Sequence, residues 1–244
     1  MRPQGETASE GMVIRRPGLL VLSVLLLATW GCGLPGGIGA ALVSGPTATP
    51  AIFLPPQWTP TPAPPTPDVP QGWEEFRAGR VHVWLPETFE GGDMGAKFDA
   101  ILDTLKSLGT EFAQSAQFVE QNPDVFVLWA FDPQPGPSGY ITNVNVTEED
   151  VPVGVSVEDY LEASLKGMPS QIKLVDQAVV SLGAFEAGKL VLSSDIQGLR
   201  GLSVVYSIKD GDRFWKVTYS TGADEFVQRT PTWEQSIRTF QLDG

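Results

Sequence analysis

The chain has 244 residues, and its 29 acidic and 16 basic residues give a formal net charge of −13 at pH 7. An acidic chain of this kind is a poor partner for nucleic acid, because phosphate backbones are bound by positively charged surfaces. One cysteine and one histidine are too few for an internal disulfide or for a metal centre built from thiolates and imidazoles.

Residues 1–32 have the parts of an export signal. Two arginines precede an apolar run over residues 19–28, and small residues follow that run. The sequence LLLATWGC resembles the box before the lipidated cysteine of bacterial lipoproteins. We therefore predict a lipid anchor at Cys32, with an uncleaved helix over residues 18–43 or simple secretion as the alternatives. Both anchored forms place the arginines inside and the rest of the chain on the extracytoplasmic face of the cell membrane.

A linker and then a single domain are expected next. Ten prolines fall within the 26 positions from Gly45 to Pro70, which removes amide donors and favours extended, polyproline-like backbone. We expect residues 33–70 to be a proline-rich disordered linker. Residues 71–244 are numerous enough to bury one hydrophobic core. They include 13 basic and 26 acidic residues, so this predicted domain carries the whole net charge of −13.

The first half of the domain mixes strand and helix patterns. Residues 81–86, VHVWLP, have the two-residue apolar period of a strand that ends at proline. Apolar residues then recur three or four apart over residues 98–119, which predicts one amphipathic helix with a bend at Gly109. Residues 125–131, VFVLWAF, predict a central strand covered on both faces, or by a helix on one face and a loop on the other. Residues 140–146, YITNVNV, should form its antiparallel neighbour.

The second half begins with a helix and is otherwise rich in strands. Ser156 is a suitable N-cap, with Asp159 three residues later, for a helix that ends before Pro169. The pair Asp210 and Gly211 predicts a hairpin between the last two of four strands. These strands are expected over residues 175–182, 189–194, 201–209 and 213–220.

The hairpin and a closing helix should supply much of the core. Thr230 is expected to cap the closing helix, with Pro231 at its first position. The residues of this helix that should point inward are Trp233, Ile237 and Phe240. The core-facing residues of the hairpin should be Val204, Tyr206 and Ile208, opposite Trp215, Val217 and Tyr219.

The order of these patterns resembles a known family. The patterns are a GW start, an LPE strand end, ITNVNV followed by SVEDYL, a GK strand, the hairpin YSIKDGDRFWKVTYS and the helix TPTWEQSIRTFQL. Together they resemble the PsbP-like fold family, bacterial lipoprotein type, which includes a photosystem II extrinsic subunit and a Ran-binding protein. The resemblance implies an α+β fold in which an antiparallel sheet of about six strands is flanked by helices. It implies no function, because the members bind different partners.

The residues predict neither catalysis nor a cofactor. The single histidine, His82, is expected on a strand as a surface or half-buried residue, and no G-x-S-x-G nucleophile motif accompanies it. The acidic run Glu148 to Asp150 has oxygen ligands that calcium uses but lacks the alternating spacing of a calcium loop, so we expect a solvated loop. We predict no catalytic, cofactor or metal site and no enzymatic activity.

A binding role is the leading hypothesis. Trp84 and Phe214 fall on the polar-alternating faces of their strands, where they would form an exposed aromatic binding patch. We predict a membrane-tethered, extracytoplasmic, non-enzymatic binding or accessory module for an unknown protein or small ligand. The alternatives are a cell-envelope hydrolase or other enzyme, with a pocket around His82 or paired carboxylates, and a structural spacer that caps a proline stalk.

Overall fold

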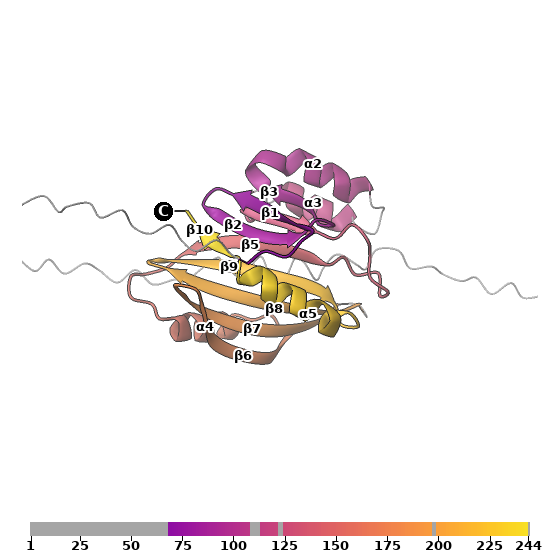
Figure 1. The fold of residues 1–244 in the computed structure, drawn as a ribbon. Coiled ribbons are helices and arrows are strands. Elements are labelled where there is room, and N and C mark those ends of the chain that lie inside the picture. The colour runs from indigo at the N-terminus through magenta and orange to yellow at the C-terminus, as the bar shows by residue number, and fades with distance from the viewer. Residues whose placement is uncertain (1–67, 108–112, 122–123, 197–198, 244) are drawn as a thin grey trace, which may run out of the picture.

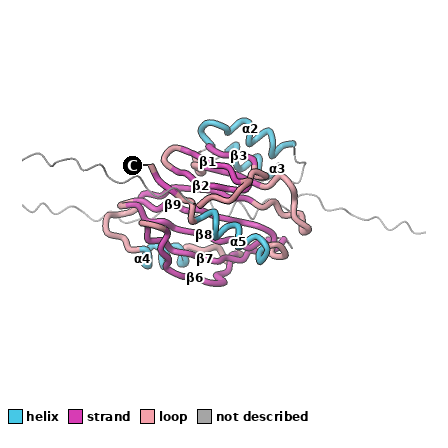
Figure 2. The backbone as a smooth tube through the Cα atoms, viewed as in Figure 1, coloured by secondary structure: helices cyan, strands magenta, loops and turns pink. Residues whose placement is uncertain are grey.

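The computed structural model describes residues 68–107, 113–121, 124–196 and 199–243 (Figure 1). The predicted leader with Cys32 and the linker up to residue 67 lie outside these residues and stay predictions. The described part contains two antiparallel sheets and four helices (Figure 2).

The two sheets are unequal in size. The larger sheet has seven strands in the order β3-β4-β5-β9-β8-β7-β6, and the smaller sheet has three in the order β1-β2-β10. The predicted α+β fold class is confirmed, although residues 81–86 belong to the smaller sheet and the larger one exceeds the expected size. The strands are β1 (Trp73–Ala78), β2 (Val81–Pro86), β3 (Glu90–Asp93), β4 (Leu128–Phe131), β5 (Asn143–Asp150), β6 (Ile172–Leu182), β7 (Phe185–Ile196), β8 (Leu199–Asp210), β9 (Arg213–Gly222) and β10 (Gln241–Leu242).

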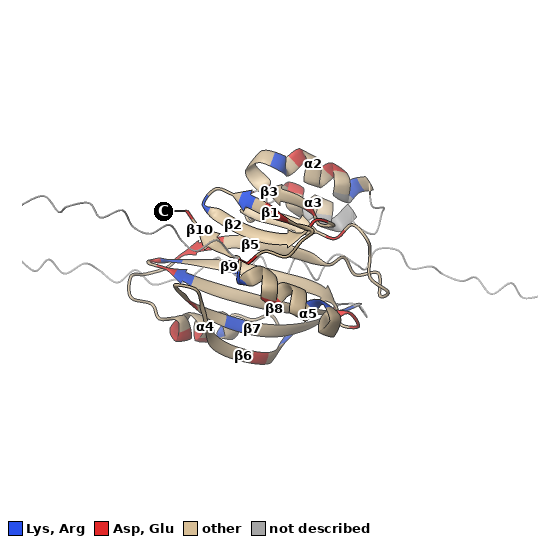
Figure 3. Ribbon diagram, viewed as in Figure 1, with Lys and Arg blue, Asp and Glu red and all other residues tan. Residues whose placement is uncertain are grey.

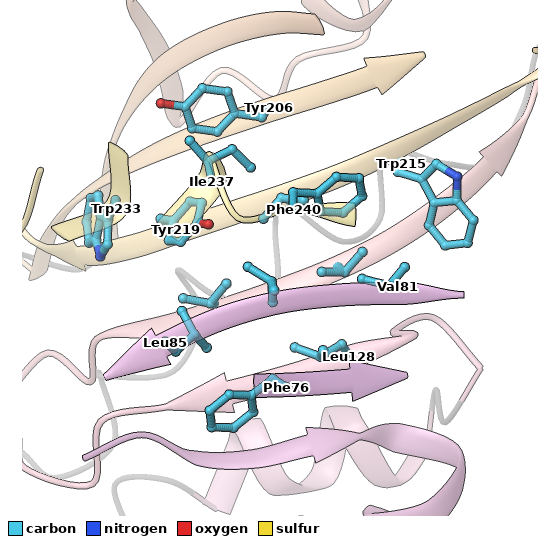
Figure 4. Close-up of a cluster of buried hydrophobic side chains, with 14 of the residues drawn as sticks. Phe76, Val81, Leu85, Leu128, Tyr206, Trp215, Tyr219, Trp233, Ile237 and Phe240 are labelled. Carbon is cyan, nitrogen blue, oxygen red and sulfur yellow. The ribbon is translucent and has the colours of Figure 1, made fainter. Parts of the chain in front are cut away.

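Both faces of the larger sheet are covered, which gives three layers. The smaller sheet and helix α5 (Phe226–Ile237) lie on one face of the larger sheet (Figure 1). The main core lies between that face and these two elements (Figure 4). On the other face, a second core forms beneath α2 (Met94–Ser107) and α3 (Ala113–Gln121). A third core forms beneath α4 (Val157–Lys166). Every helix is therefore placed by an apolar sheet face that it removes from water.

Strand β4 shows why the sheet needs both layers. Leu128 and Ala130 belong to the main core, whereas Trp129 and Phe131 belong to the core under α2 and α3. The prediction of a central strand that is covered on both faces is confirmed. Its antiparallel neighbour is β5, as predicted, with Leu128 opposite Val146.

The hairpin between β8 and β9 has the predicted face pairs, but its turn lies one residue later. Asp210 pairs with Arg213, so Gly211 and Asp212 are the two turn residues. Gly211 has φ +65°, a conformation that glycine adopts without strain. The two predicted sets of core-facing residues do lie opposite each other, for example Val204 opposite Tyr219 and Ile208 opposite Trp215.

The expectation of one helix over residues 98–119 is wrong. Lys106 Nζ lies 3.3 Å from Glu120 Oε1, whereas fourteen residues of one straight helix would separate them by about 21 Å. Two helices, α2 and α3, therefore pack side by side. The apolar spacing runs through both because both bury residues such as Ile101 and Val119 in one core.

The closing helix begins earlier than predicted. Helix α5 starts at Phe226 after the N-cap Glu225, so Pro231 is an interior residue and Thr230 is no cap. Instead, the Thr230 hydroxyl donates to the Phe226 carbonyl over 2.7 Å. Pro231 leaves the carbonyl of Val227 without its helical hydrogen bond, and water can replace that bond because Val227 is 84% exposed. The inward residues Trp233, Ile237 and Phe240 are buried as predicted.

Gly91→Ala tests the packing of β3 on β4. Gly91 has φ +118°, and an added Cβ would lie 2.3 Å from the Trp129 carbonyl oxygen. We expect the free energy of unfolding to fall by about 3 kcal/mol, because backbone on both strands must move. Urea denaturation measures the change. Gly79→Ala is the matched control, since Gly79 has φ +55° and open space around it, and it should lose only about 1 kcal/mol. Equal losses of stability in the two variants would contradict the close approach of Gly91 to the Trp129 carbonyl.

Candidate binding site

A hollow of about 350 Å³ lies between α5 and the β6 end of the larger sheet. Strands β7 and β8 contribute Lys189 and Tyr206 to its base. One wall is the end of β6 with its turn, and the other is α5, which lies across this part of the sheet (Figure 1). A hollow of this volume has room for a small ligand or for side chains of a partner. The residues that line it are Val180, Ser181, Leu182, Gly183, Lys189, Tyr206, Glu234, Ile237 and Arg238.

Charged groups meet apolar ones in this hollow. Lys189 Nζ lies 3.3 Å from Glu234 Oε1 and 5.8 Å from the centre of the Tyr206 ring. Arg238, one helical turn after Glu234, has no ion-pair partner among the described residues. Val180 and Leu182 add apolar surface on the β6 side. The hollow thus has one carboxylate and two cations.

The protonation of Lys189 and Tyr206 follows from burial and from their contact. Burial lowers the pKa of Lys189, but Tyr206 and Glu234 together raise that pKa by more, so the net change is upward. Burial is also the main cause that raises the pKa of Tyr206, and Lys189 opposes it. At neutral pH the site therefore has an ammonium group beside a neutral phenol.

Helix α5 is held firmly, so the wall of the hollow is preformed. Trp233 stacks on Tyr219 of β9, with ring centres 5.8 Å apart. The Tyr219 hydroxyl donates to Ser236 Oγ over 3.0 Å, and Ser236 donates in turn to the Trp84 carbonyl over 2.7 Å. The buried inner face of α5 thus turns Glu234 and Arg238 toward the hollow.

The charge of the hollow differs from that of the domain. Lysines and arginines are interspersed with acidic residues along the ribbon (Figure 3), and residues 71–244 have a net charge of −13. With Lys189, Arg238 and Glu234, the hollow has a net charge of +1. A local excess of positive charge favours an anionic group in the ligand.

The predicted patch of Trp84 and Phe214 does not form. Phe214 is 0% exposed, and its ring stacks on Tyr160 of α4 with the centres 3.9 Å apart. Trp84 is half-buried on β2 in the other sheet. The alternation of apolar and polar residues along the strand predicted that the face with Phe214 is exposed to solvent. The prediction is wrong because α4 covers this face.

His82 is buried, where a surface or half-buried position was expected. Its Nδ1 lies 2.9 Å from Glu75 Oε1, and its Nε2 lies 2.8 Å from Asp243 Oδ2 without hydrogen-bond geometry. The hydrogen bond with His82 is the main reason why the pKa of Glu75 is lowered. The Asp243 amide also donates to the Arg80 carbonyl. This cluster therefore attaches the segment after β10 to the smaller sheet.

The acidic run Glu148 to Asp150 is a strand end paired with basic side chains, where a solvated loop was expected. Arg213 contacts Glu148 at 2.9 Å and Asp150 at 2.8 Å. Lys216 contacts Glu149 at 3.0 Å, and Glu149 also accepts from the Tyr160 hydroxyl.

Within the described ranges, no cluster of three histidine, cysteine or acidic residues is suited to a metal ion. None of the helices in those ranges is long and apolar enough to span a membrane.

Comparisons with known proteins give structural matches only. No family model and no curated protein matches the chain. The chain is similar to the structure of Mycobacterium tuberculosis LpqN, involved in cell envelope biogenesis, at 11% identity and a TM-score of 0.45 over 67% of this chain and 83% of LpqN. It is also similar to PsbP of Synechocystis sp. PCC 6803, at 10% identity and a TM-score of 0.43 over 72% and 95% of the two chains. The Pseudomonas aeruginosa immunity protein TplEi matches at 9% identity and 0.40, over 70% and 97%.

Sequence reasoning missed the hollow, although one signal was present. Lys189 is a charged residue within the otherwise apolar strand segment AGKLVL, and a charge in a buried strand needs a partner. Its partner Glu234 belongs to a helix much later in the chain. Only the packing of α5 against β9, in the same sheet as β7, brings the two together.

Phe214→Ala tests the burial of this ring. We expect a loss of about 3–5 kcal/mol in the free energy of unfolding, because the change removes a large side chain from a packed core and its stack on Tyr160. Denaturant unfolding measures the loss, and Phe214→Leu is the control that should lose less. A loss of only a few tenths of a kcal/mol is typical of a surface position. That result would contradict the burial of Phe214 and support the exposed patch predicted from the sequence.

Glu75→Gln tests the cluster at His82. Because the pKa of Glu75 is lowered from 4.5 in the folded state, its ionised form stabilises the protein above about pH 4.5, and this contribution is lost as the pH falls through the lowered pKa. The variant should therefore lose less stability than the wild type between about pH 5 and 3. Glu74→Gln, on the same strand, controls for the loss of a charge. Equal acid dependence of the wild type and Glu75→Gln would contradict the contact.

Proposed function

We propose that residues 71–244 form a non-enzymatic binding or accessory module whose ligand site is the hollow between α5 and the β6 end of the larger sheet. The observation that carries the proposal is the charge of this hollow, which is positive within a strongly acidic domain. The ligand it favours has an anionic group for Arg238 and an apolar part for Val180 and Leu182.

The contacts in the hollow support binding of a partner. The ion pair with Glu234 and the contact with Tyr206 satisfy Lys189 within the protein, whereas Arg238 is exposed and unpaired among the described residues. A guanidinium presents several donors in one plane, which suits a carboxylate or another planar anion. Arg238 is therefore the group through which the site would recognise charge.

Photo-crosslinking tests the site in the full-length chain. A photoreactive benzoylphenylalanine at the exposed position Ser181, on the rim of the hollow, should capture a partner in cells that express the protein. Arg238→Glu should reduce the captured product at least about tenfold, because one attractive and one repulsive interaction change together.

Lys166→Glu makes the same change of charge on α4, where Lys166 is 74% exposed and pairs with Glu162. This control should leave capture unchanged. A captured product that is insensitive to Arg238→Glu, or equally sensitive to both variants, would contradict the proposed site.

We further propose that the module is held at the extracytoplasmic face of the membrane by a lipid on Cys32, a residue outside the described part. Support comes from the LLLATWGC box and the proline-rich sequence that follows it. Intact-mass analysis of protein extracted from membranes should give a chain that begins at Cys32 with added acyl mass. Cys32→Ala should abolish that species, and an unmodified full-length mass in the wild type would contradict the anchor.

A further inference from the structure

The outer edge of β6 is long, and its protecting features, a bulge at Val175 and the Asp176 carboxylate that accepts from the Gln177 amide over 2.9 Å, all lie before residue 178. Strand β6 ends the larger sheet, so its outer N–H and C=O groups have no strand partner among the described residues. Val175 is an extra residue in a bulge, and after it Asp176–Leu182 pair continuously with β7. The last six of these residues, QAVVSL, include no charge and no proline. Such an edge is a ready template for an added strand.

The opposite edge of the same sheet is protected. Strand β3 has only four residues, and Gly91 and Gly92 have φ values of +118° and +135°. Lys97 Nζ donates to the Gly91 carbonyl over 3.1 Å. Short length, irregular backbone and a lysine are the usual ways to block edge pairing. The contrast makes the open edge of β6 a specific feature of this sheet.

An added strand would meet contacts on both of its faces. Val180 and Leu182 of β6 pack toward the main core and line the hollow. Val179 lies on the other face, opposite Gly188, which α4 approaches closely through Leu161. Val179 is 43% exposed. Because side chains alternate along a strand, every second residue of the added strand would point toward the hollow and the others toward Val179.

Resting on the proposed function, we infer that the ligand is an extended peptide segment of a partner protein that adds as a strand to β6 and places one acidic side chain in the hollow at Arg238. Main-chain hydrogen bonds along residues 178–182 supply affinity, and the hollow supplies specificity. The segment is otherwise apolar or β-branched, since the acidic domain repels a ligand with many negative charges.

Two other occupants are disfavoured by their chemistry. The linker of this chain is poor in amide donors because ten of its 26 residues from Gly45 to Pro70 are proline, and a ladder needs those donors. A second copy of the chain would bring another net charge of −13 to the same edge.

A peptide-display selection followed by an N-methyl scan tests the strand. The bait is the full-length chain in detergent, and the library consists of random linear peptides of about ten residues. Recovered peptides should alternate β-branched residues around one acid. Methylation of backbone amides should weaken binding at every second position only, because alternate amides of an added strand face β6.

The acidic side chain is tested by coupling it to Arg238. Replacement of the peptide aspartate or glutamate by its amide should weaken binding to the wild type about tenfold. In Arg238→Gln the same replacement should change affinity less than about twofold, as in a double-mutant cycle with one contact removed. Lys166→Gln, on α4, should behave as the wild type.

The negative results separate this inference from the proposed function. Peptides that depend on Arg238 but show no two-residue N-methyl pattern would overturn the added strand and leave the binding site standing. A selection without binders, alongside crosslinks that Arg238→Glu abolishes, would do the same. A full-length chain that sediments as a dimer, and as a monomer in Val179→Lys, would also overturn it and assign the edge to a second copy.

Discussion

Ser236 connects three parts of the molecule. Its hydroxyl accepts a hydrogen bond from Tyr219 on β9 and donates one to the Trp84 carbonyl on β2, so helix α5, the larger sheet and the smaller sheet meet at one buried group. Burial raises the pKa of Tyr219 well above its ordinary value, which keeps the phenol as a donor. The stack of Trp233 on Tyr219 adds about 1 kcal/mol beyond area burial. The position of α5, and with it the binding hollow, depends on this junction.

The larger sheet is asymmetric in a way that suits a binding role. Its β3 edge is short and blocked by Lys97, whereas its β6 edge is long, free of charge after Asp176 and next to the hollow. The hollow and the edge share Val180 and Leu182. A ligand that used one would therefore lie beside the other. The distribution of charge is asymmetric as well, because Arg238 places a positive group in the hollow beside β6, whereas the domain as a whole is acidic.

Much of the fold was predictable because apolar periodicity reports directly which faces are buried. The β8–β9 pairs, the two-sided burial of β4 and the Ser156 cap were confirmed, the last by the Asp159 amide that donates to Ser156 Oγ over 3.0 Å. Periodicity failed where two elements share one core, as for α2 and α3, and where a helix contains proline, as for α5. It also failed at Phe214, since a strand pattern cannot show that a helix covers its second face.

By itself, the sequence determined the α+β class, the order of most elements, the acidic domain and the residues that enter the core. Each of these depends on neighbours in the chain or on composition. Only the tertiary structure decided that the strands divide between two sheets, that α5 packs against β9 and β2, and that Lys189, Tyr206, Glu234 and Arg238 line one hollow. The physical reason is that these contacts join residues far apart in the chain, whose approach is set by how layers pack and not by any local pattern.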